Sequence, residues 1–168
     1  MADNQKKKKR ILGVESNIFF VGLTSFLTDT TTKMVYSILP LFLTTLGASK
    51  TEISLIEGIA ESTASVLKSL SGWWGDKIGR NKPFMIIGYG ITALLSPLFA
   101  FVTTPLQVLS IRFVERVGKG IRTAPRDSLV AGSSEENNNA GLNFGFHKAM
   151  DNSGAIVGPL IAFAVLAA

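Results

Sequence analysis

Residues 83–111 read PFMIIGYGITALLSPLFAFVTTPLQVLSI and contain no charged side chain. A membrane-spanning helix needs about 20 mainly apolar residues, so the stretch is long enough for one such helix and the start of another. The segment 102–105 divides the stretch, because it ends in Pro105 and proline is favoured in the first turn of a helix. The pattern indicates two successive membrane helices.

Three further stretches, at 16–28, 34–49 and 152–168, are also free of charge. A solvated surface needs charged residues every few positions, so gaps of this kind are typical of segments inside a membrane. The mean hydropathy of +0.33 agrees with this interpretation. The sequence therefore predicts an all-α polytopic membrane protein with five transmembrane helices. We expect them at about 18–46, 53–75, 83–101, 106–131 and 141–168.

The net charge of +5 comes from 17 Lys and Arg against 12 Asp and Glu, and five basic residues stand together at 6–10. The rest of the chain is balanced, which disfavours nucleic acid as a partner, since folds that bind nucleic acid carry a basic face. With no cysteine and one histidine, a metal centre is disfavoured and no cofactor is expected. The sequence also lacks a nucleophile elbow and a phosphate loop, so it does not indicate an enzyme.

The basic residues also predict the orientation in the membrane, because short loops rich in lysine and arginine stay in the cytoplasm. The N-terminal segment 1–17 carries five of them and the connector 76–82 carries three. The connector 47–51 has one and the connector 102–105 has none. We therefore expect a multi-pass protein of the cell membrane, in which a basic cytoplasmic segment precedes the transmembrane domain at 18–168.

Ionisable residues inside the predicted helices gather on one face of each helix, given a rotation of about 100° per residue. A charge that faces lipid costs at least about 2.5–3.5 kcal/mol, so these stripes are expected to face an aqueous cavity or a protein neighbour. The third helix has no stripe and is expected to face lipid. The stripes are Asp29, Lys33 and Tyr36; Glu57, Glu61 and Lys68; Arg112, Glu115, Arg116 and Lys119; and Asn143, His147, Asp151, Gly154 and Gly158.

Two of these stripes also have a purely structural interpretation. Asp29 and Lys33 have the i, i+4 spacing of an ion pair that would only hold the first helix together. His147 is either a histidine at the end of a helix or a hydrogen-bonded partner of Asp151, four residues later. Both interpretations stay open beside a functional one.

The basic residues of the fourth helix divide in the same way. Lys119, Arg122 and Arg126 lie toward its end, so an extension of these side chains to the cytoplasmic surface and a role in the cavity both stay open. Arg112 and Arg116 lie deeper in apolar sequence, which favours a functional role.

The connector after the second helix carries a recognisable motif. Residues 72–82 read GWWGDKIGRNK, which resembles the pattern G-x-x-x-D-K/R-x-G-R-x-K/R of the major facilitator superfamily. A glycine allows close approach of a second helix, and a second glycine permits the positive φ of a tight reversal. The positions that match, expected to form a gating motif between helices, are Gly72, Asp76, Lys77, Gly79 and Arg80.

Two further motifs follow in the order expected for that superfamily. Residues 116–124 resemble R-x-x-Q-G-x-G-A-A, with Lys119 and Arg122 as departures. Residues 154–159 resemble G-x-x-x-G-P, with Gly158 and Pro159 in its last positions. The wider strings 118–127 and 144–151 resemble a prokaryotic branch of general permeases.

The resemblance implies a fold and a function. Members of the superfamily have twelve helices in two halves that rock around a central site, and each half is an inverted pair of three-helix units. In that scheme the first and fourth helices line the cavity, and the second and fifth face the opposite half. The chain then corresponds to the N-terminal portion of such a permease, with five helices of the first six-helix bundle. The expected cavity residues are Asp29, Lys33, Tyr36, Arg112, Glu115 and Arg116, and the expected fifth-helix motif is His147, Asp151, Gly154, Gly158 and Pro159.

The expected partners are the lipid bilayer, a small solute or ion, with coupling to protons left open, and the missing C-terminal half or another chain. Basic residues in the cavity favour an anionic or zwitterionic solute, and Asp29 and Glu115 weaken that preference. The alternatives are a separate five-helix membrane protein that assembles with itself or with a second chain, and an inactive truncated product.

Overall fold

The computed structural model of the protein describes residues 10–11, 13–135 and 140–167, so that most of the basic run at 6–10 lies outside the described residues. The chain is all-α, as predicted, apart from a short antiparallel ribbon of β1 (Arg10–Ile11) and β2 (Val14–Glu15). The long elements are α1 (Ser16–Thr45), α2 (Lys50–Ile78), α3 (Lys82–Leu95), α4 (Pro105–Glu135) and α5 (Ala140–Ala167).

One segment differs from the helix expected at 83–101. The α-helix α3 ends at Leu95, and the chain continues as the 3₁₀ helix η1 (Ser96–Phe101). Pro97 accounts for the change, because proline has no N–H for the α-helical hydrogen bond and its ring crowds the preceding turn.

Local side-chain chemistry sets the ends of α2. At its start the hydroxyl of Ser49 accepts a hydrogen bond from the Glu52 backbone N–H at 3.2 Å, and the Ser49 backbone N–H donates to the Glu52 carboxylate at 2.7 Å. This capping box stabilises the ionised carboxylate and lowers the pKa of Glu52. At the other end Gly79 adopts φ 65°, a left-handed conformation that glycine adopts without strain.

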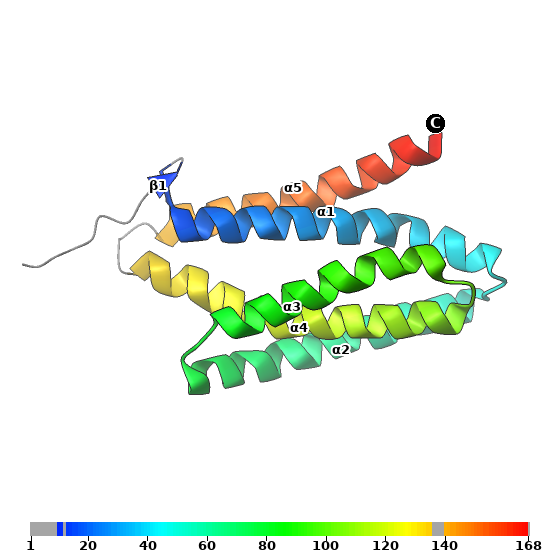
Figure 1. The fold of residues 1–168 in the computed structure, drawn as a ribbon, viewed down its shortest axis with the longest axis horizontal. Helices are drawn as coiled ribbons and strands as arrows, with labels where there is room; N and C mark the ends of the chain where they lie inside the picture. The colour runs from blue at the N-terminus through cyan, green and yellow to red at the C-terminus, as the bar shows by residue number, and fades with distance from the viewer. Residues whose placement is uncertain (1–9, 12, 136–139, 168) are drawn as a thin grey trace, which may run out of the picture.

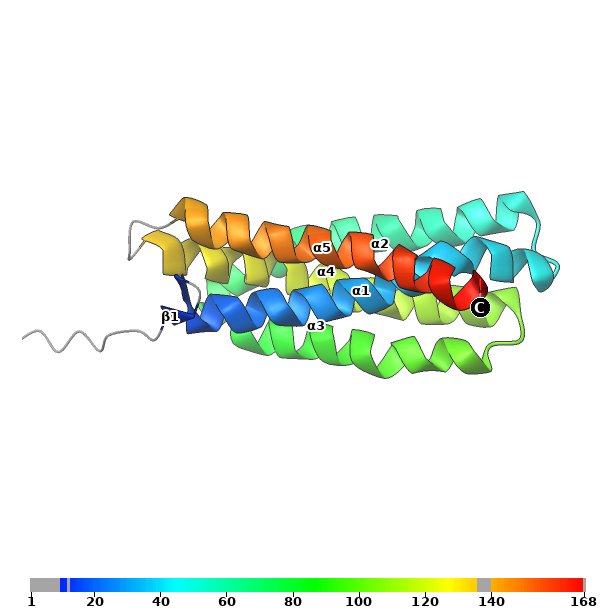
Figure 2. The same ribbon diagram turned by 90° about the horizontal axis from the view of Figure 1, so that it is seen from above.

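The helices form two groups that lie side by side (Figure 1). One group is the parallel pair α1 and α5, and in the other α4 packs against both α2 and α3. Figure 2 shows α1 and α4 in the middle of the molecule, with α3 on one side and α5 with α2 on the other. Contacts between α1 and α4 themselves are sparse, and polar side-chain contacts such as Arg122 with Asp29 and Arg126 with Ser25 join the two groups.

Glycines set the distance between α1 and α5. A Cβ atom added at Gly158 would lie 2.5 Å from the carbonyl oxygen of Thr30, and one added at Gly154 would lie 2.7 Å from that of Phe26. Both neighbours are backbone atoms of α1, which cannot move aside as a flexible side chain would. The two glycines, four residues apart on α5, therefore allow the close backbone contact seen in membrane helix pairs.

Glycines also set the position of α4. A Cβ atom added at Gly88 of α3 would lie 2.5 Å from the carbonyl oxygen of Gly118, and one added at Gly120 would lie 2.9 Å from that of Ala64 on α2. The hydroxyl of Ser71 on α2 donates a hydrogen bond to the Gly120 carbonyl oxygen at 2.8 Å. Residues 118–120 are thus where α4 approaches both of its neighbours most closely.

Large apolar side chains cover the outside of the molecule, for example Ile86, Leu94 and Phe163. Among the described residues, two helical stretches are long and apolar enough to cross a membrane, Lys82–Phe101 and Gly141–Ala167. α1, α2 and α4 contain charged residues within their length, and most of those charges lie on faces turned toward other helices.

We expect Gly158→Ala to destabilise the protein and Gly145→Ala, on the same helix, to leave it unchanged or slightly more stable. Alanine normally favours a helix over glycine by about 0.5–1 kcal/mol, and the space around Gly145 is open. At Gly158 the added methyl group must push α1 away, at a cost of about 1–3 kcal/mol. Thermal unfolding in detergent measures both variants, and equal melting temperatures would contradict the close contact.

Candidate functional site

Five cations lie along one face of α4. Arg112, Arg116, Lys119, Arg122 and Arg126 follow one another at intervals of three or four residues, which keeps them on one side of a helix. The four arginines are buried, with Arg112 fully buried and Arg122 only 3% exposed, whereas Lys119 is half-buried. We refer to these five residues as the cation row.

The first part of the cation row is neutralised by α2. The guanidinium of Arg112 donates to both carboxylate oxygens of Glu57, at 3.2 and 3.3 Å, and to Glu115 at 2.8 Å. One turn further along both helices, Arg116 lies 3.4 Å from a carboxylate oxygen of Glu61. The pairs Glu57–Arg112 and Glu61–Arg116 follow the same register because α2 and α4 run parallel.

Tyr36 of α1 covers this part of the cation row. Its ring lies 4.8 Å from the guanidinium carbon of Arg112, 5.9 Å from that of Arg116 and 5.4 Å from the ammonium group of Lys33. A ring face attracts cations at these distances. One aromatic side chain therefore connects the basic residues of α1 and α4.

The last part of the cation row is neutralised by α4 itself and by α5. Arg126 lies 3.0 Å from a carboxylate oxygen of Asp127 and 3.2 Å from one of Asp151. The carboxylate of Asp151 lies 3.8 Å from Nδ1 of His147. The other ring nitrogen of His147 is 3.4 Å from the hydroxyl of Ser25, which also accepts a hydrogen bond from Arg126 at 3.3 Å.

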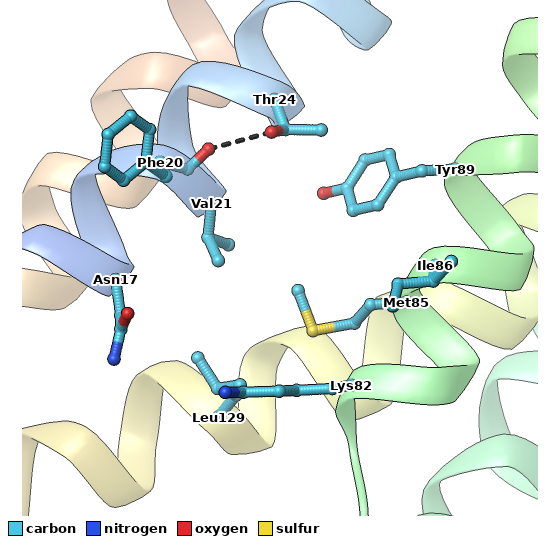
Figure 3. A pocket seen from close by; sticks show the side chains of 9 residues that line it. All are labelled: Asn17, Phe20, Val21, Thr24, Lys82, Met85, Ile86, Tyr89 and Leu129. Atoms are coloured by element: carbon cyan, nitrogen blue, oxygen red, sulfur yellow. Dashed lines mark hydrogen bonds between the residues drawn. The ribbon is translucent and has the colours of Figure 1, made fainter.

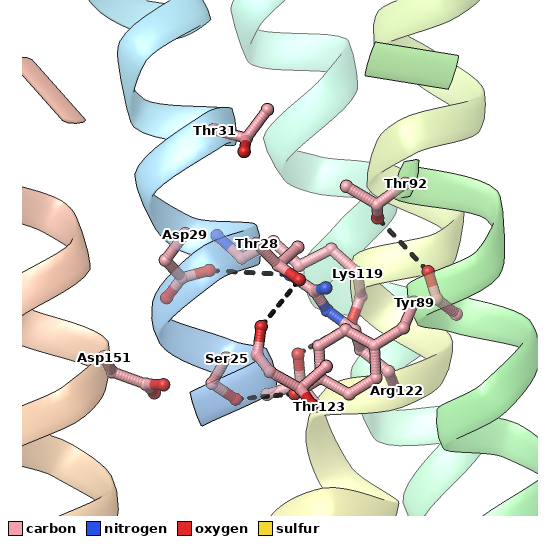
Figure 4. Close-up of polar contacts among 12 residues, drawn as sticks. Ser25, Thr28, Asp29, Thr31, Tyr89, Thr92, Lys119, Arg122, Thr123 and Asp151 are labelled. Carbon is pink, nitrogen blue, oxygen red and sulfur yellow. Dashed lines mark hydrogen bonds and ion pairs between the residues drawn. The ribbon is translucent and has the colours of Figure 1, made fainter. Parts of the chain in front are cut away.

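The middle of the cation row lies between α1 and α3 (Figure 4). The guanidinium carbon of Arg122 lies 4.4 Å from the ring centre of Tyr89, and its Nη2 atom is 3.5 Å from the carboxylate of Asp29. The hydroxyl of Tyr89 forms a hydrogen bond of 2.6 Å with that of Ser25. Figure 4 shows Lys119 beside Arg122, with Thr28 of α1 next to it.

Of the six expected cavity residues, the structure joins Lys33 of α1 with Arg112 and Arg116 of α4 through the ring of Tyr36. On α4, Arg112 pairs with Glu115, and the Tyr36 ring lies near the guanidinium groups of Arg112 and Arg116. Among the described residues Asp29 is paired with Arg122, one helix away, and no ion pair joins it to Lys33. The structure therefore does not contain the i, i+4 ion pair between Asp29 and Lys33 that was one interpretation of the sequence.

The fifth-helix residues divide between two roles in the structure. His147 and Asp151 contact Ser25 and Arg126, whereas Gly154 and Gly158 form the contact with α1. Pro159 lies inside α5, directly after that contact.

The motif at 72–82 lies at the end of α2. Gly72 is close to α4, since a Cβ atom added there would lie 3.3 Å from that of Ala124. Gly79 ends the helix, Arg80 is exposed, and the ammonium group of Lys77 lies 5.1 Å from the ring centre of Trp73. Asp76 belongs to the last turns of α2, and its side chain lies outside the part that the structure describes.

Sequence reasoning left two residues of the site open and missed two others. For Arg122 and Arg126 the sequence left a surface position and a role in the cavity open, and the structure buries both side chains, at 3% and 8% exposed. Tyr89 lies in the helix without charges, and Ser25 in an uncharged stretch, so neither stood out. The signal for the α2 pairs was present, because 57 and 61 have the same spacing as 112 and 116.

An apolar pocket of about 640 Å³ adjoins the site between α1 and α3 (Figure 3). Tyr89 belongs both to this pocket and to the surroundings of Arg122. The residues that line it are Asn17, Phe20, Val21, Thr24, Lys82, Met85, Ile86, Tyr89 and Leu129.

We expect Glu57→Gln to destabilise the protein more than Glu61→Gln. Both substitutions remove one carboxylate charge from α2, but the side chain of Glu57 is 23% exposed and holds the buried Arg112, whereas that of Glu61 is 61% exposed. Loss of the Glu57 hydrogen bonds is expected to cost about 1–3 kcal/mol, and loss of the exposed pair at most about 1 kcal/mol. Thermal unfolding measures the difference, and a larger effect of Glu61→Gln would contradict these pairings.

Comparison with known proteins gives a consistent family. Residues 21–168 match the family model of the Major Facilitator Superfamily. An uncharacterized MFS-type transporter of Methanocaldococcus jannaschii is 33% identical over 94% of this chain and 39% of its own length. The multidrug resistance protein MdtG of Salmonella schwarzengrund is 30% identical over 86% of this chain and 36% of its own length.

A third relative is a multi-drug resistance efflux pump homolog of Lactococcus lactis, 27% identical over 94% of this chain and 40% of its own length. The chain thus spans about two-fifths of the length of these relatives. No solved structure matches it significantly. The family consists of membrane transporters and not of enzymes, and since its model matches nearly the whole sequence, this chain belongs to the major facilitator superfamily.

Proposed function

We propose that this chain supplies the first five transmembrane helices of an alternating-access transporter, which moves a small solute across the cell membrane. The cation row between α4 and the helices around it carries the proposal. In this view residues 18–168 form part of a six-helix bundle. Transport requires the helices that make up the rest of the relatives' length.

The pairing of charges supports a membrane location for α2 and α4. A charge that faces lipid costs at least about 2.5–3.5 kcal/mol, and buried charges are tolerated when they pair. Arg112 is fully buried and bonded to Glu57 of α2. Glu57 is thus paired within the chain and is not free to contact a second copy. This pairing favours a transporter bundle over the alternative in which the polar face of the second helix serves self-assembly.

The polar surface shared by α1 and α4 supports a solute pathway there. The expected cavity residues Asp29, Lys33 and Tyr36 come from α1, and Arg112, Glu115 and Arg116 from α4. Asp29, Lys33 and Tyr36 keep part of their surface exposed, so a solute can reach them. An acid next to an arginine is also suited to proton coupling, since its charge state depends on whether the arginine stays beside it.

The ends of the bundle support a cytoplasmic N-terminus. The connector between α2 and α3, which carries Arg80, lies at the same end of the molecule as β1, and the connectors with fewer basic residues lie at the opposite end (Figure 1). The basic end is expected on the cytoplasmic side.

Single cysteines test this orientation, because the natural sequence has none. Asn81→Cys lies at the basic end and Thr51→Cys at the opposite end. We expect a membrane-impermeant maleimide added to intact cells to label position 51, and to label position 81 only after the cells are permeabilised. The reverse pattern would contradict the proposed orientation.

Transport itself is tested in the longest natural polypeptide that contains this sequence. Membrane vesicles are assayed for flux of labelled carboxylates, phosphate esters, amino acids and ethidium. We expect Asp29→Asn and Arg112→Ala to reduce the flux of the transported solute at least about tenfold, since each removes a charge from the solute pathway. Lys50→Gln, at the exposed start of α2, serves as the control. Wild-type flux in both variants would remove these residues from the mechanism.

A further inference from the structure

Arg122 has two buried nitrogens without a hydrogen-bond partner among the described residues, whereas Arg116 has one, its Nε, and Arg112 and Arg126 have none. Nε, Nη1 and Nη2 of Arg112 all donate to carboxylates, and those of Arg126 all donate to carboxylates or to Ser25. In contrast, Nε and Nη1 of Arg122 are buried and have no hydrogen-bond partner among the described residues. Buried charged donors of this kind are costly, so proteins seldom leave them unused.

The carboxylate nearest to Arg122 satisfies it only weakly. Asp29 approaches Nη2 alone, at 3.5 Å, which is at the outer limit of a hydrogen bond. A guanidinium offers its N–H groups as a fork that matches two oxygens of a carboxylate or phosphate. Asp29 leaves this two-pronged contact unmade.

Around Lys119 and Arg122 the positive charges also outnumber the carboxylates that pair with them. Arg112 faces Glu57 and Glu115, Arg116 faces Glu61, and Arg126 faces Asp127 and Asp151. Arg122, one turn after Lys119 on α4, has only the carboxylate of Asp29 within ion-pair distance among the described side chains. No carboxylate among the described side chains lies within ion-pair distance of the Lys119 ammonium group.

The surroundings hold Arg122 in place and leave one side for entry. The Tyr89 ring lies against the guanidinium, and the Gly88 contact holds α3 against the Cβ atom of Arg122, 2.6 Å from an added methyl group. Asp29 and Lys119 are only partly buried. Figure 4 shows them on the α1 side of Arg122, beside Thr28, so an incoming group reaches the arginine past these two residues.

We propose that Lys119 and Arg122 form the recognition site for an oxyanion, the carboxylate or phosphate group of the transported solute, and that Asp29 occupies this site as a competing carboxylate when the solute is absent. The solute anion takes both prongs of the Arg122 guanidinium and the ammonium group of Lys119. This assignment rests on the proposed transport function and gives its substrate class.

Anion binding is measured without transport, on the purified longest natural polypeptide in nanodiscs. Sodium acetate and sodium phosphate are titrated separately against sodium chloride at constant ionic strength, and thermal unfolding is followed by tryptophan fluorescence. A ligand that binds the folded state raises the melting temperature saturably. We expect saturation by acetate if the solute group is a carboxylate and by phosphate if it is a phosphate. Saturation by neither, or equally by chloride, would overturn the proposal.

Substitutions at the site are expected to change the anion response in opposite directions, which a general loss of structure cannot do. We expect Lys119→Gln to weaken the anion response at least about tenfold, and Arg122→Lys to do the same because the fork is lost. Asp29→Asn is expected to strengthen the response, since the competing carboxylate is gone. Lys50→Gln, exposed and far from the site, should respond as wild type.

A wild-type response in Lys119→Gln, or a weaker response in Asp29→Asn, would overturn the assignment. Far-UV circular dichroism checks the helix content of each variant, and Lys119→Gln decides if Arg122→Lys fails to fold, because Lys119 is only half-buried. Saturable anion binding without flux would support the anion site and contradict the proposed transport function. Flux without anion binding would support transport and contradict the anion site.

Discussion

Five cations lie on one face of α4, and the four buried arginines among them need partners, because a charge surrounded by lipid or by apolar protein is too costly to leave alone. The helices around α4 meet this demand in turn. α2 supplies Glu57 and Glu61, α1 supplies Asp29, and α5 supplies Asp151. Charge pairing thus determines which face of each neighbouring helix turns toward α4, and it brings the polar residues of four helices into one region.

Close helix contacts make these pairings possible. Glycines on α5 bring the backbone of α1 within reach, and those on α3 and α4 do the same for the second group of helices. A methyl group at Gly158 or Gly88 would meet backbone oxygen at 2.5 Å. Since an ion pair weakens with distance, a separation of the helices by even one methyl group would also weaken the pairs between them. Glycine position and charge position are therefore parts of one arrangement.

The sequence predicted the all-α class, because charge-free stretches and polar stripes follow from local periodicity, and it predicted the family through its motifs. It did not predict which stripes meet. Glu57 and Arg112 are neighbours only through the parallel contact of α2 with α4, which residues 64 and 120 set. Tyr89 was missed because a single tyrosine in an apolar helix has no periodic signal, and its role depends on where α3 crosses Arg122.

The pairing of α2 with the cation row is tested most directly by a double-mutant cycle on Glu57→Gln and Arg112→Gln, with unfolding free energies measured by detergent titration. Residues in direct contact show coupling energies of about 0.5–3 kcal/mol, whereas independent sites add to within about 0.5 kcal/mol. With hydrogen bonds of 3.2 and 3.3 Å between the two side chains, we expect a coupling above about 1 kcal/mol. Additive effects of the two substitutions would show that α2 does not neutralise α4.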